Sequence, residues 1–168
     1  IGCGAGVVGV CLGRVGAKSV TCTDGDMRTV ENCRRNMVAN NILPDEDRSS
    51  CQQLFWEEGW NGDQPDVVLG ADLLYDPEVI PVLVRLLSSL LPQLQPDEDP
   101  YCCAYIATTL RNQSTVDSFV CAVYGAGLCA EDCTEEMQRE RDISFQDCAI
   151  LANRDSVKVH RIQRQASK

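Results

Sequence analysis

The sequence lacks any run of about 18 apolar residues, the length that a membrane-spanning helix requires. Its longest apolar stretch, residues 79–94, is interrupted by Arg85, Ser88, Ser89 and Pro92. Basic residues are also scarce: 15 Lys and Arg stand against 25 Asp and Glu, so the net charge is −10. Because nucleic-acid binding requires a basic face that displaces counterions, we expect neither a membrane protein nor a nucleic-acid-binding protein.

The sequence also lacks cysteine and histidine residues at the spacings that are typical of metal sites. His160 is the only histidine, and no Cys-x-x-Cys pair occurs among the eleven cysteines. Structural zinc sites need thiolates or imidazoles clustered at short spacing, and Cys129 with Cys133 is the nearest approach. We therefore predict no metal site and interpret the cysteines as small buried core residues in a reducing cytoplasm. His160 is predicted to lie on the surface of a strand.

The chain has 168 residues, of which 44 % are hydrophobic, and this suits a single domain. We take a monomer as the working expectation for its oligomeric state. The chain begins at Ile1, directly before a glycine-rich loop and without an initiator Met or a signal peptide. Such a loop normally follows a strand. We therefore expect residues 1–168 to form one domain whose N-terminal strand is truncated.

Helical and strand-like segments alternate along the chain. Helices are predicted at Val7–Val15, Met27–Asn40, Pro77–Leu91 and Ser114–Gly125; strands at Ser19–Thr23, Ser50–Phe55, Asp66–Ala71 and Tyr101–Leu110; and loops at Glu57–Pro65 and Pro92–Pro100, the second acidic. Asp76 is placed to cap the third helix, with Pro77 at its first position. Leu128–Thr134 and Val157–Gln163 are expected to form an antiparallel C-terminal strand pair around a polar segment. This alternation predicts an α/β, Rossmann-like sheet with helices on both faces.

A glycine-rich loop and a distant carboxylate indicate a nucleoside site. Gly2, Gly4 and Gly6 come before the first helix, and glycines let the backbone approach a ligand. Asp24 ends the next strand, where its carboxylate can accept hydrogen bonds from both ribose hydroxyls. Ligands of open α/β sheets bind at the carboxyl ends of strands, which is where both features fall.

The glycines fit two cofactor classes. Gly4, Gly6 and Gly9 match the dinucleotide pattern G-x-G-x-x-G, whereas Gly2, Gly4 and Gly6 form the G-x-G-x-G of S-adenosylmethionine enzymes. An NAD(P)-dependent oxidoreductase is therefore one alternative, although no Tyr-x-x-x-Lys pair and no mid-chain histidine supplies a proton donor. A non-catalytic interaction domain that keeps this fold is another.

The segment after the buried strand Asp66–Ala71 favours the S-adenosylmethionine class. It reads Asp72-Leu-Leu-Tyr75, an Asp-x-x-Tyr motif, within the longer stretch PDVVLGADLLYDPEVIPVLV. After the next strand comes ATTLRN, residues 107–112. With the glycine loop and Asp24, these segments resemble the seven-β-strand methyltransferases, and among them protein-lysine methyltransferase family 16. The Arg111-Asn112 pair is similar to the branch that acts on eukaryotic elongation factor 2.

The resemblance implies a fold and an activity. The fold is a seven-stranded methyltransferase sheet, and the activity is methyl transfer from S-adenosylmethionine to a lysine of a protein substrate, elongation factor 2. Asp72 can hold the amine and stabilise the charge that develops on it, so we expect Asp72→Ala to abolish methylation while cofactor binding persists. Tyr75 shares a side with Asp72 if the segment turns helically.

Further positions carry over from the family. Trp56 corresponds to a tryptophan near the adenine, while Phe55 replaces the usual acidic residue there and Glu57 or Glu58 is its substitute. Ala71 lies where the methionine part of the cofactor passes. Arg111 and Asn112 are expected to contact the substrate.

Overall fold

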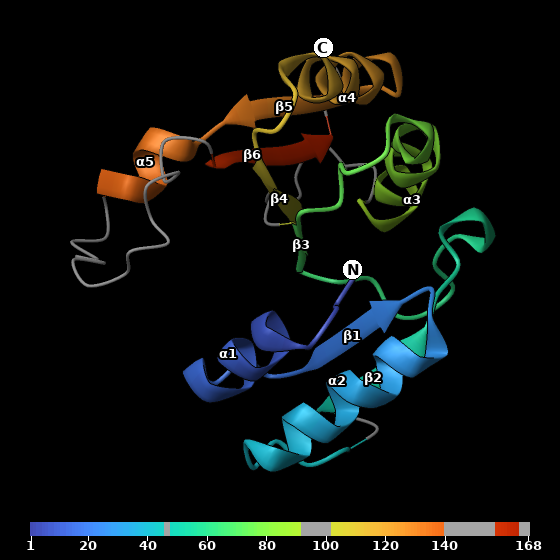
Figure 1. Cartoon of the computed structure of the whole chain (residues 1–168), viewed down its shortest axis with the longest axis vertical. Coiled ribbons are helices and arrows are strands. Elements are labelled where there is room, and N and C mark those ends of the chain that lie inside the picture. Colours follow the sequence, from blue (N-terminus) through green and yellow to red (C-terminus); the bar gives the residue numbers. More distant parts are fainter. Residues whose placement is uncertain (46–47, 92–101, 140–156, 165–168) are drawn as a thin grey trace, which may run out of the picture. The chain divides into compact units, whose positions relative to one another are not determined.

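The computed structural model describes residues 1–45, 48–91, 102–139 and 157–164 (Figure 1). They fall into two compact units, Ile1–Asn61 and Gly62–Lys168. Each unit is described on its own below. The predicted acidic loop at 92–100 and the predicted start of a strand at Tyr101 lie outside the described residues. None of the helices in those ranges is long and apolar enough to cross a membrane.

Unit 1 pairs two parallel strands beneath two helices. Its elements are α1 (Val7–Val15), β1 (Val20–Asp24), α2 (Met27–Ala39), β2 (Ser49–Gln53) and a 3-10 turn at Trp56–Glu58. The register runs from Val20 opposite Ser49 to Asp24 opposite Gln53, so both strands end at one edge. That shared edge places the residues following β1 and β2 together.

Helix α2 begins and packs as its sequence predicts. The Asp26 side chain caps it by accepting a 2.8 Å bond from the Arg28 N–H. Val30, Cys33 and Met37, spaced three and four residues apart, are buried against the strands. Val38, the apolar residue next to Met37, is 42 % exposed because it lies beyond the edge of this stripe.

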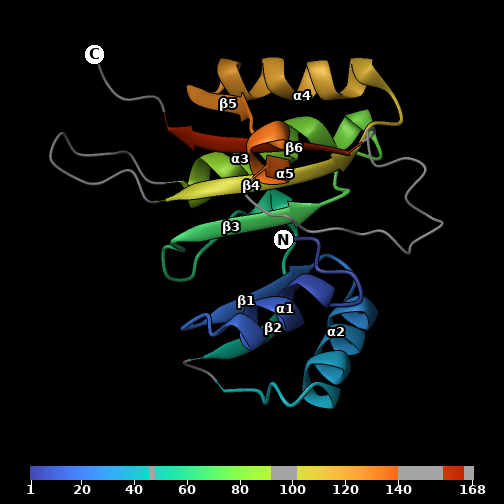
Figure 2. The ribbon, with the colours of Figure 1, turned by 90° about the vertical axis from the view of Figure 1, so that its left-hand side faces the viewer.

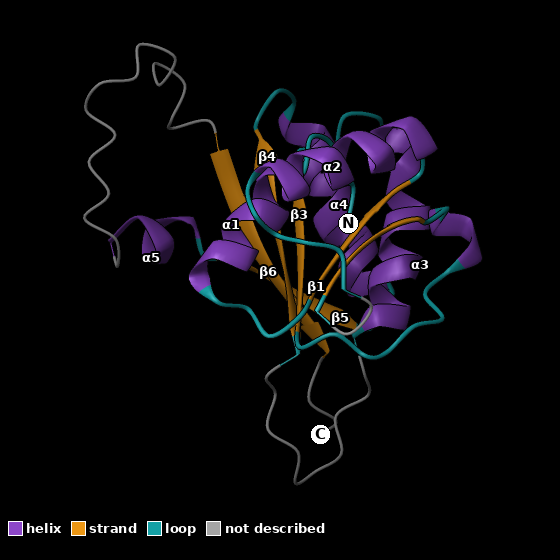
Figure 3. Ribbon diagram, turned by 90° about the horizontal axis from the view of Figure 1, so that it is seen from below, coloured by secondary structure: helices purple, strands orange, loops and turns teal. Residues whose placement is uncertain are grey.

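Unit 2 is built on a four-stranded sheet. In chain order it contains β3 (Val67–Ala71), a 3-10 turn (Pro77–Val79), α3 (Ile80–Leu90), β4 (Cys103–Thr109), α4 (Gln113–Gly125), β5 (Leu128–Asp132), α5 (Thr134–Arg139) and β6 (Val157–Arg164). Their order across the sheet is β3-β4-β6-β5 (Figure 2). β3 and β4 are parallel, whereas β6 is antiparallel to both of its neighbours. Helices α3 and α4 pack side by side (Figure 3).

The α/β class and the antiparallel C-terminal pair are confirmed. The described ranges contain six strands in two sheets, so a single seven-stranded sheet with helices on both faces, and a single domain, stay predictions. Asp76 caps the predicted helix by accepting from the Glu78 N–H at 2.9 Å, but the first turn, Pro77–Val79, is 3-10 rather than α-helical. Part of the polar segment after β5 forms α5, which was not predicted.

The surface prediction for His160 is wrong. His160 is 6 % exposed, because β6 is an inner strand and the ring meets Phe119 of α4 edge-on, with 6.4 Å between ring centroids. A sequence pattern gives the faces of a strand, but not whether the strand lies inside its sheet.

Candidate functional site

The glycine-rich loop has a backbone that side-chain-bearing residues rarely adopt. Gly2, Gly4 and Gly6 have φ angles of 61°, 51° and 84°, all in the left-handed region. Gly6 is the N-cap of α1 and has no side chain to bond the first helical N–H groups. A Cβ at Gly4 would meet nothing within 4 Å, so the backbone there faces open space. The loop therefore offers bare backbone to a ligand.

Both carboxylate oxygens of Asp24 accept a backbone hydrogen bond, one of them from this loop. Oδ2 accepts from the Gly4 N–H at 3.1 Å, and Oδ1 accepts from the Asp26 N–H at 3.2 Å. The Cys3 N–H also donates to the Thr23 carbonyl at 2.8 Å, which continues the pairing of loop and strand. Since a carboxylate oxygen accepts two hydrogen bonds, each oxygen keeps one position for a ribose hydroxyl.

Trp56 follows β2 at the same edge of the unit 1 sheet. The Leu54 N–H donates to the Asp24 carbonyl at 2.9 Å, so the pairing of the two strands extends past their ends. Trp56 then opens the 3-10 turn and is half-buried, whereas Phe55 is 46 % exposed. The structure thus brings Gly4, Asp24 and Trp56 to one edge.

Asp72 lies at the carboxyl end of β3 in unit 2 and is held there by hydrogen bonds to β4. It directly follows β3, with Ala71 exposed at the strand's end, and its φ of 53° is left-handed although it is not a glycine. The Asp72 N–H donates to the Ala107 carbonyl and its Oδ1 accepts from the Thr109 N–H, both at 2.8 Å. This clamp to β4 holds the strained backbone and leaves the carboxylate half exposed. Asp76, and not Asp72, caps the following helix.

Arg111 and Asn112 follow β4 at this edge. The Arg111 guanidinium lies 3.5 Å from Asp72 Oδ2, and the two side chains are 68 % and 51 % exposed. Such exposed pairs stabilise by at most about 1 kcal/mol, so an incoming amine can compete for Oδ2. Asn112 caps α4, because its Oδ1 accepts from the Ser114 N–H at 3.0 Å and from the Ser114 hydroxyl.

Tyr75 is placed differently from the sequence expectation. Residues 72–75 form no helical turn; instead Leu73 and Leu74 are buried and hold the segment down. Tyr75 is 69 % exposed and Asp72 is also exposed, so both side chains are free to meet a partner from solvent. Asp72 and Tyr75 are exposed because they lie on either side of the buried pair Leu73 and Leu74, and not because they share one side of a helix.

Sequence reasoning missed one cluster. Cys22, Cys33 and Cys51 place their sulfur atoms within 4.8 Å of one another. They come from β1, α2 and β2, and no short spacing in the sequence connects them. The expectation that the cysteines are buried core residues holds for Cys22, Cys33, Cys103 and Cys133. Of the other described cysteines, four are half-buried, and Cys11 and Cys121 are exposed.

Comparison with known proteins decides the family. The family model described as lysine methyltransferase matches residues 1–120, which include the glycine loop, Asp24, Asp72 and Arg111. The chain belongs to the lysine methyltransferase family. Its resemblance to seven-β-strand methyltransferases, first seen in the loop and the Asp-x-x-Tyr motif, is thereby confirmed.

Curated relatives bear names consistent with this family. The chain is 36 % identical over 132 residues to protein-lysine N-methyltransferase EFM3 of Chaetomium thermophilum, covering 73 % of this chain and 38 % of that protein. It is 30 % identical over 141 residues to human protein-lysine N-methyltransferase EEF2KMT, covering 76 % and 42 %. The chain thus spans less than half the length of these two relatives.

A solved structure shares the fold. Magnesium protoporphyrin IX methyltransferase of Synechocystis PCC 6803, determined with bound SAM, aligns with 98 % of this chain and 67 % of its own, with a TM-score of 0.61. Sequence identity is 16 %, so this likeness shows the α/β methyltransferase fold alone.

Proposed function

We propose that this protein is an S-adenosylmethionine-dependent protein-lysine N-methyltransferase. The observation that carries the proposal is Asp72, a carboxylate kept at the end of β3 by a left-handed backbone and two hydrogen bonds to β4. A strained, solvent-facing acid in a family of lysine methyltransferases is suited to receive a lysine amine.

The cofactor part of the proposal rests on unit 1. The left-handed glycines expose backbone at the start of α1, and Asp24 keeps one acceptor position free on each oxygen. These groups fit a nucleoside, with Asp24 binding the ribose hydroxyls and Trp56 lying against the adenine. Gly2, Gly4 and Gly6 leave space for the remainder of the cofactor, and we assign Ala71 to its methionine part. When bound, S-adenosylmethionine supplies an electrophilic methyl group on a sulfonium.

Asp72 supplies the other half of the chemistry. Its Oδ2 can accept a hydrogen bond from the lysine amine and orient the nitrogen lone pair. As the amine gains positive charge, the nearby carboxylate stabilises it. Thr109 fixes Oδ1, so the carboxylate does not have to reorganise during the reaction. Tyr75 is proposed to border the lysine, and Arg111 and Asn112 to contact the substrate protein.

The finer substrate assignment belongs to this proposal. The ATTLRN segment and relatives named EFM3 and EEF2KMT support elongation factor 2 as the protein substrate. We also propose that the enzyme is cytoplasmic and monomeric, and that it forms a single domain with a seven-stranded sheet.

The test is methyl transfer from radiolabelled S-adenosylmethionine to purified elongation factor 2. Asp72→Asn is the sharpest variant, since Asn tolerates left-handed φ and can still accept from the Thr109 N–H, so only the charge is lost. We expect it to lower kcat at least about 100-fold, a size typical of losing one electrostatic stabiliser. Binding of S-adenosylhomocysteine should be unchanged.

Asp76→Asn is the matched control. This carboxylate lies four residues from Asp72 and caps a turn, and we expect the variant to keep its activity. Turnover by Asp72→Asn equal to that of Asp76→Asn would remove Asp72 from the mechanism. Methylation of a different protein, with elongation factor 2 unmodified, would overturn the substrate assignment alone.

A further inference from the structure

The cysteine cluster of unit 1 gathers three thiols around a common point. Cys22, Cys33 and Cys51 have their Sγ atoms within 4.8 Å of one another, and the Cys33–Cys51 sulfur distance is 3.7 Å. A pyramidal three-coordinate centre with bonds of about 2.3 Å to three sulfurs holds them about 3.5 Å apart, and a planar one holds them about 4 Å apart. The thiols therefore stand near the spacing that a three-coordinate centre requires.

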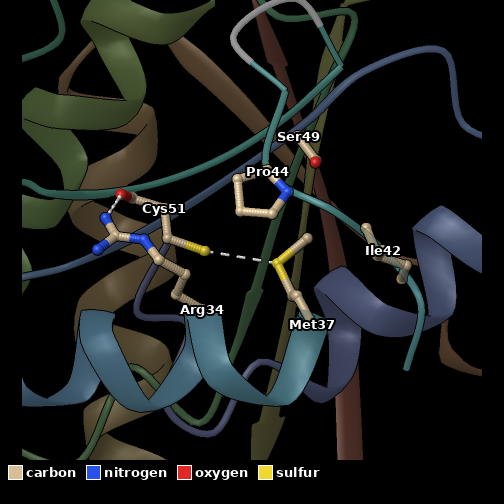
Figure 4. Close-up of a pocket in the computed structure, with 6 residues that line it drawn as sticks. All are labelled: Arg34, Met37, Ile42, Pro44, Ser49 and Cys51. Carbon is tan, nitrogen blue, oxygen red and sulfur yellow. Dashed lines mark hydrogen bonds between the residues drawn. The ribbon is translucent and has the colours of Figure 1, made fainter. Parts of the chain in front are cut away.

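Cys51 is the most accessible of the three cysteines. Cys22 and Cys33 are buried, but Cys51 is half-buried and lines a small pocket with Arg34, Met37, Ile42, Pro44 and Ser49 (Figure 4). The Cys51 thiol points at the Met37 thioether, 3.4 Å away, and Met37 is also 3.8 Å from Cys22. A reagent from solvent therefore meets Cys51 before the two buried thiols.

The surroundings disfavour negative charge. Burial raises the pKa of Cys22 to about 11, with a contribution from Cys51, and raises the pKa of Cys33 further, with a contribution from Cys22. Arg34, which lines the pocket, donates to Glu31 and to the Cys51 carbonyl and not to a thiol. Three thiolates around a monovalent or divalent metal would leave net negative charge among Val20, Met37 and other apolar side chains.

We propose that Cys22, Cys33 and Cys51 form a binding site for trivalent arsenic, supplied as arsenous acid. Each thiol replaces one hydroxyl: an As–S bond forms, an As–O bond breaks, and the thiol proton leaves with the hydroxide as water. Arsenous acid and three thiols thus give an arsenic trithiolate and three waters, without any change of oxidation state. The product is neutral, as this apolar interior requires, and it joins α2, β1 and β2.

The experiment is a titration of the reduced chain with arsenous acid, in a phosphine reductant that does not compete as a thiol. Cys3 packs against the same cluster, so Cys3→Ser is present in every protein of the series to prevent substitution. Native mass spectrometry should show one arsenic per chain with the loss of three hydrogens. We also expect a higher melting temperature, reversed by a dithiol chelator.

Matched variants assign the site. Cys51→Ser and Cys22→Ser should each weaken arsenic binding by at least about tenfold, equal to about 1.4 kcal/mol. Cys121→Ser, an exposed cysteine on α4, should bind as the parent does. Phenylarsine oxide, which needs two thiols, should still label Cys22→Ser through Cys33 and Cys51. Far-ultraviolet circular dichroism of Cys22→Ser and Cys51→Ser checks that both variants remain folded.

Two results would overturn the proposal. The first is a folded parent that retains no arsenic. The second is arsenic binding that Cys51→Ser and Cys22→Ser leave unchanged, which would place the ligand on other cysteines. None of these readouts depends on methyl transfer, so failure here is distinguishable from failure of the proposed function.

Discussion

Replacing Gly6 by alanine should destabilise the protein through two separable effects. The φ of 84° is left-handed, a conformation that costs an L-residue about 1–2 kcal/mol. The new Cβ would also lie 2.6 Å from Cys33 Sγ, inside a buried cluster, and overpacking of this kind costs about 1–3 kcal/mol. We therefore expect Gly6→Ala to lower the free energy of unfolding by about 2–5 kcal/mol.

Gly4→Ala is the matched control for the backbone effect. Gly4 has a φ of 51°, and a Cβ there meets nothing within 4 Å. It should lose only the conformational contribution of about 1–2 kcal/mol. Urea unfolding followed by far-ultraviolet circular dichroism measures both variants, and the difference between them isolates the clash.

Cys33→Ala then tests whether the clash is with this sulfur. In the double variant the new Cβ no longer meets a sulfur atom. Its loss in free energy of unfolding should therefore be smaller, by about 1–3 kcal/mol, than the sum of the losses of the two single variants. Equal stabilities of Gly6→Ala and Gly4→Ala, or strict additivity with Cys33→Ala, would refute the reasoning.

Other predictions follow from single contacts. Burial lowers the pKa of His160, so the folded state favours the neutral ring, and stability should decline as pH falls below the ordinary value of about 6.5. Melting temperatures between pH 7.5 and 5 should show this decline relative to His160→Gln, and parallel curves would contradict it. Asp76→Ala should lower stability by about 1 kcal/mol through loss of the cap, measurable by urea unfolding, while Asp76→Asn should lose less than half as much.

Local sequence patterns predicted the elements well because local physics governs them. The alternation of strands and helices, the cap at Asp76 and the glycine-rich loop each depend on neighbouring residues or on a fixed strand–turn–helix order. Gly4 and Asp24 are 20 residues apart, yet they meet because a loop and the end of a parallel strand share one sheet edge.

Features that depend on the arrangement of distant strands were missed. His160 is buried because β6 lies between β4 and β5, and the three thiols meet because β1, β2 and α2 pack together. The clamp on Asp72 was also hidden, since its partners Ala107 and Thr109 belong to β4. Periodicity along the chain holds no information about which strands become neighbours.

The cofactor assignment is the central claim, and calorimetric titration of the chain with S-adenosylhomocysteine, and separately with NAD, tests it most directly. We predict micromolar binding of S-adenosylhomocysteine, no binding of NAD, and a loss of at least about tenfold in Asp24→Asn, which keeps one acceptor oxygen but not the charge. Binding of NAD in place of S-adenosylhomocysteine, or binding that Asp24→Asn leaves unchanged, would contradict the account.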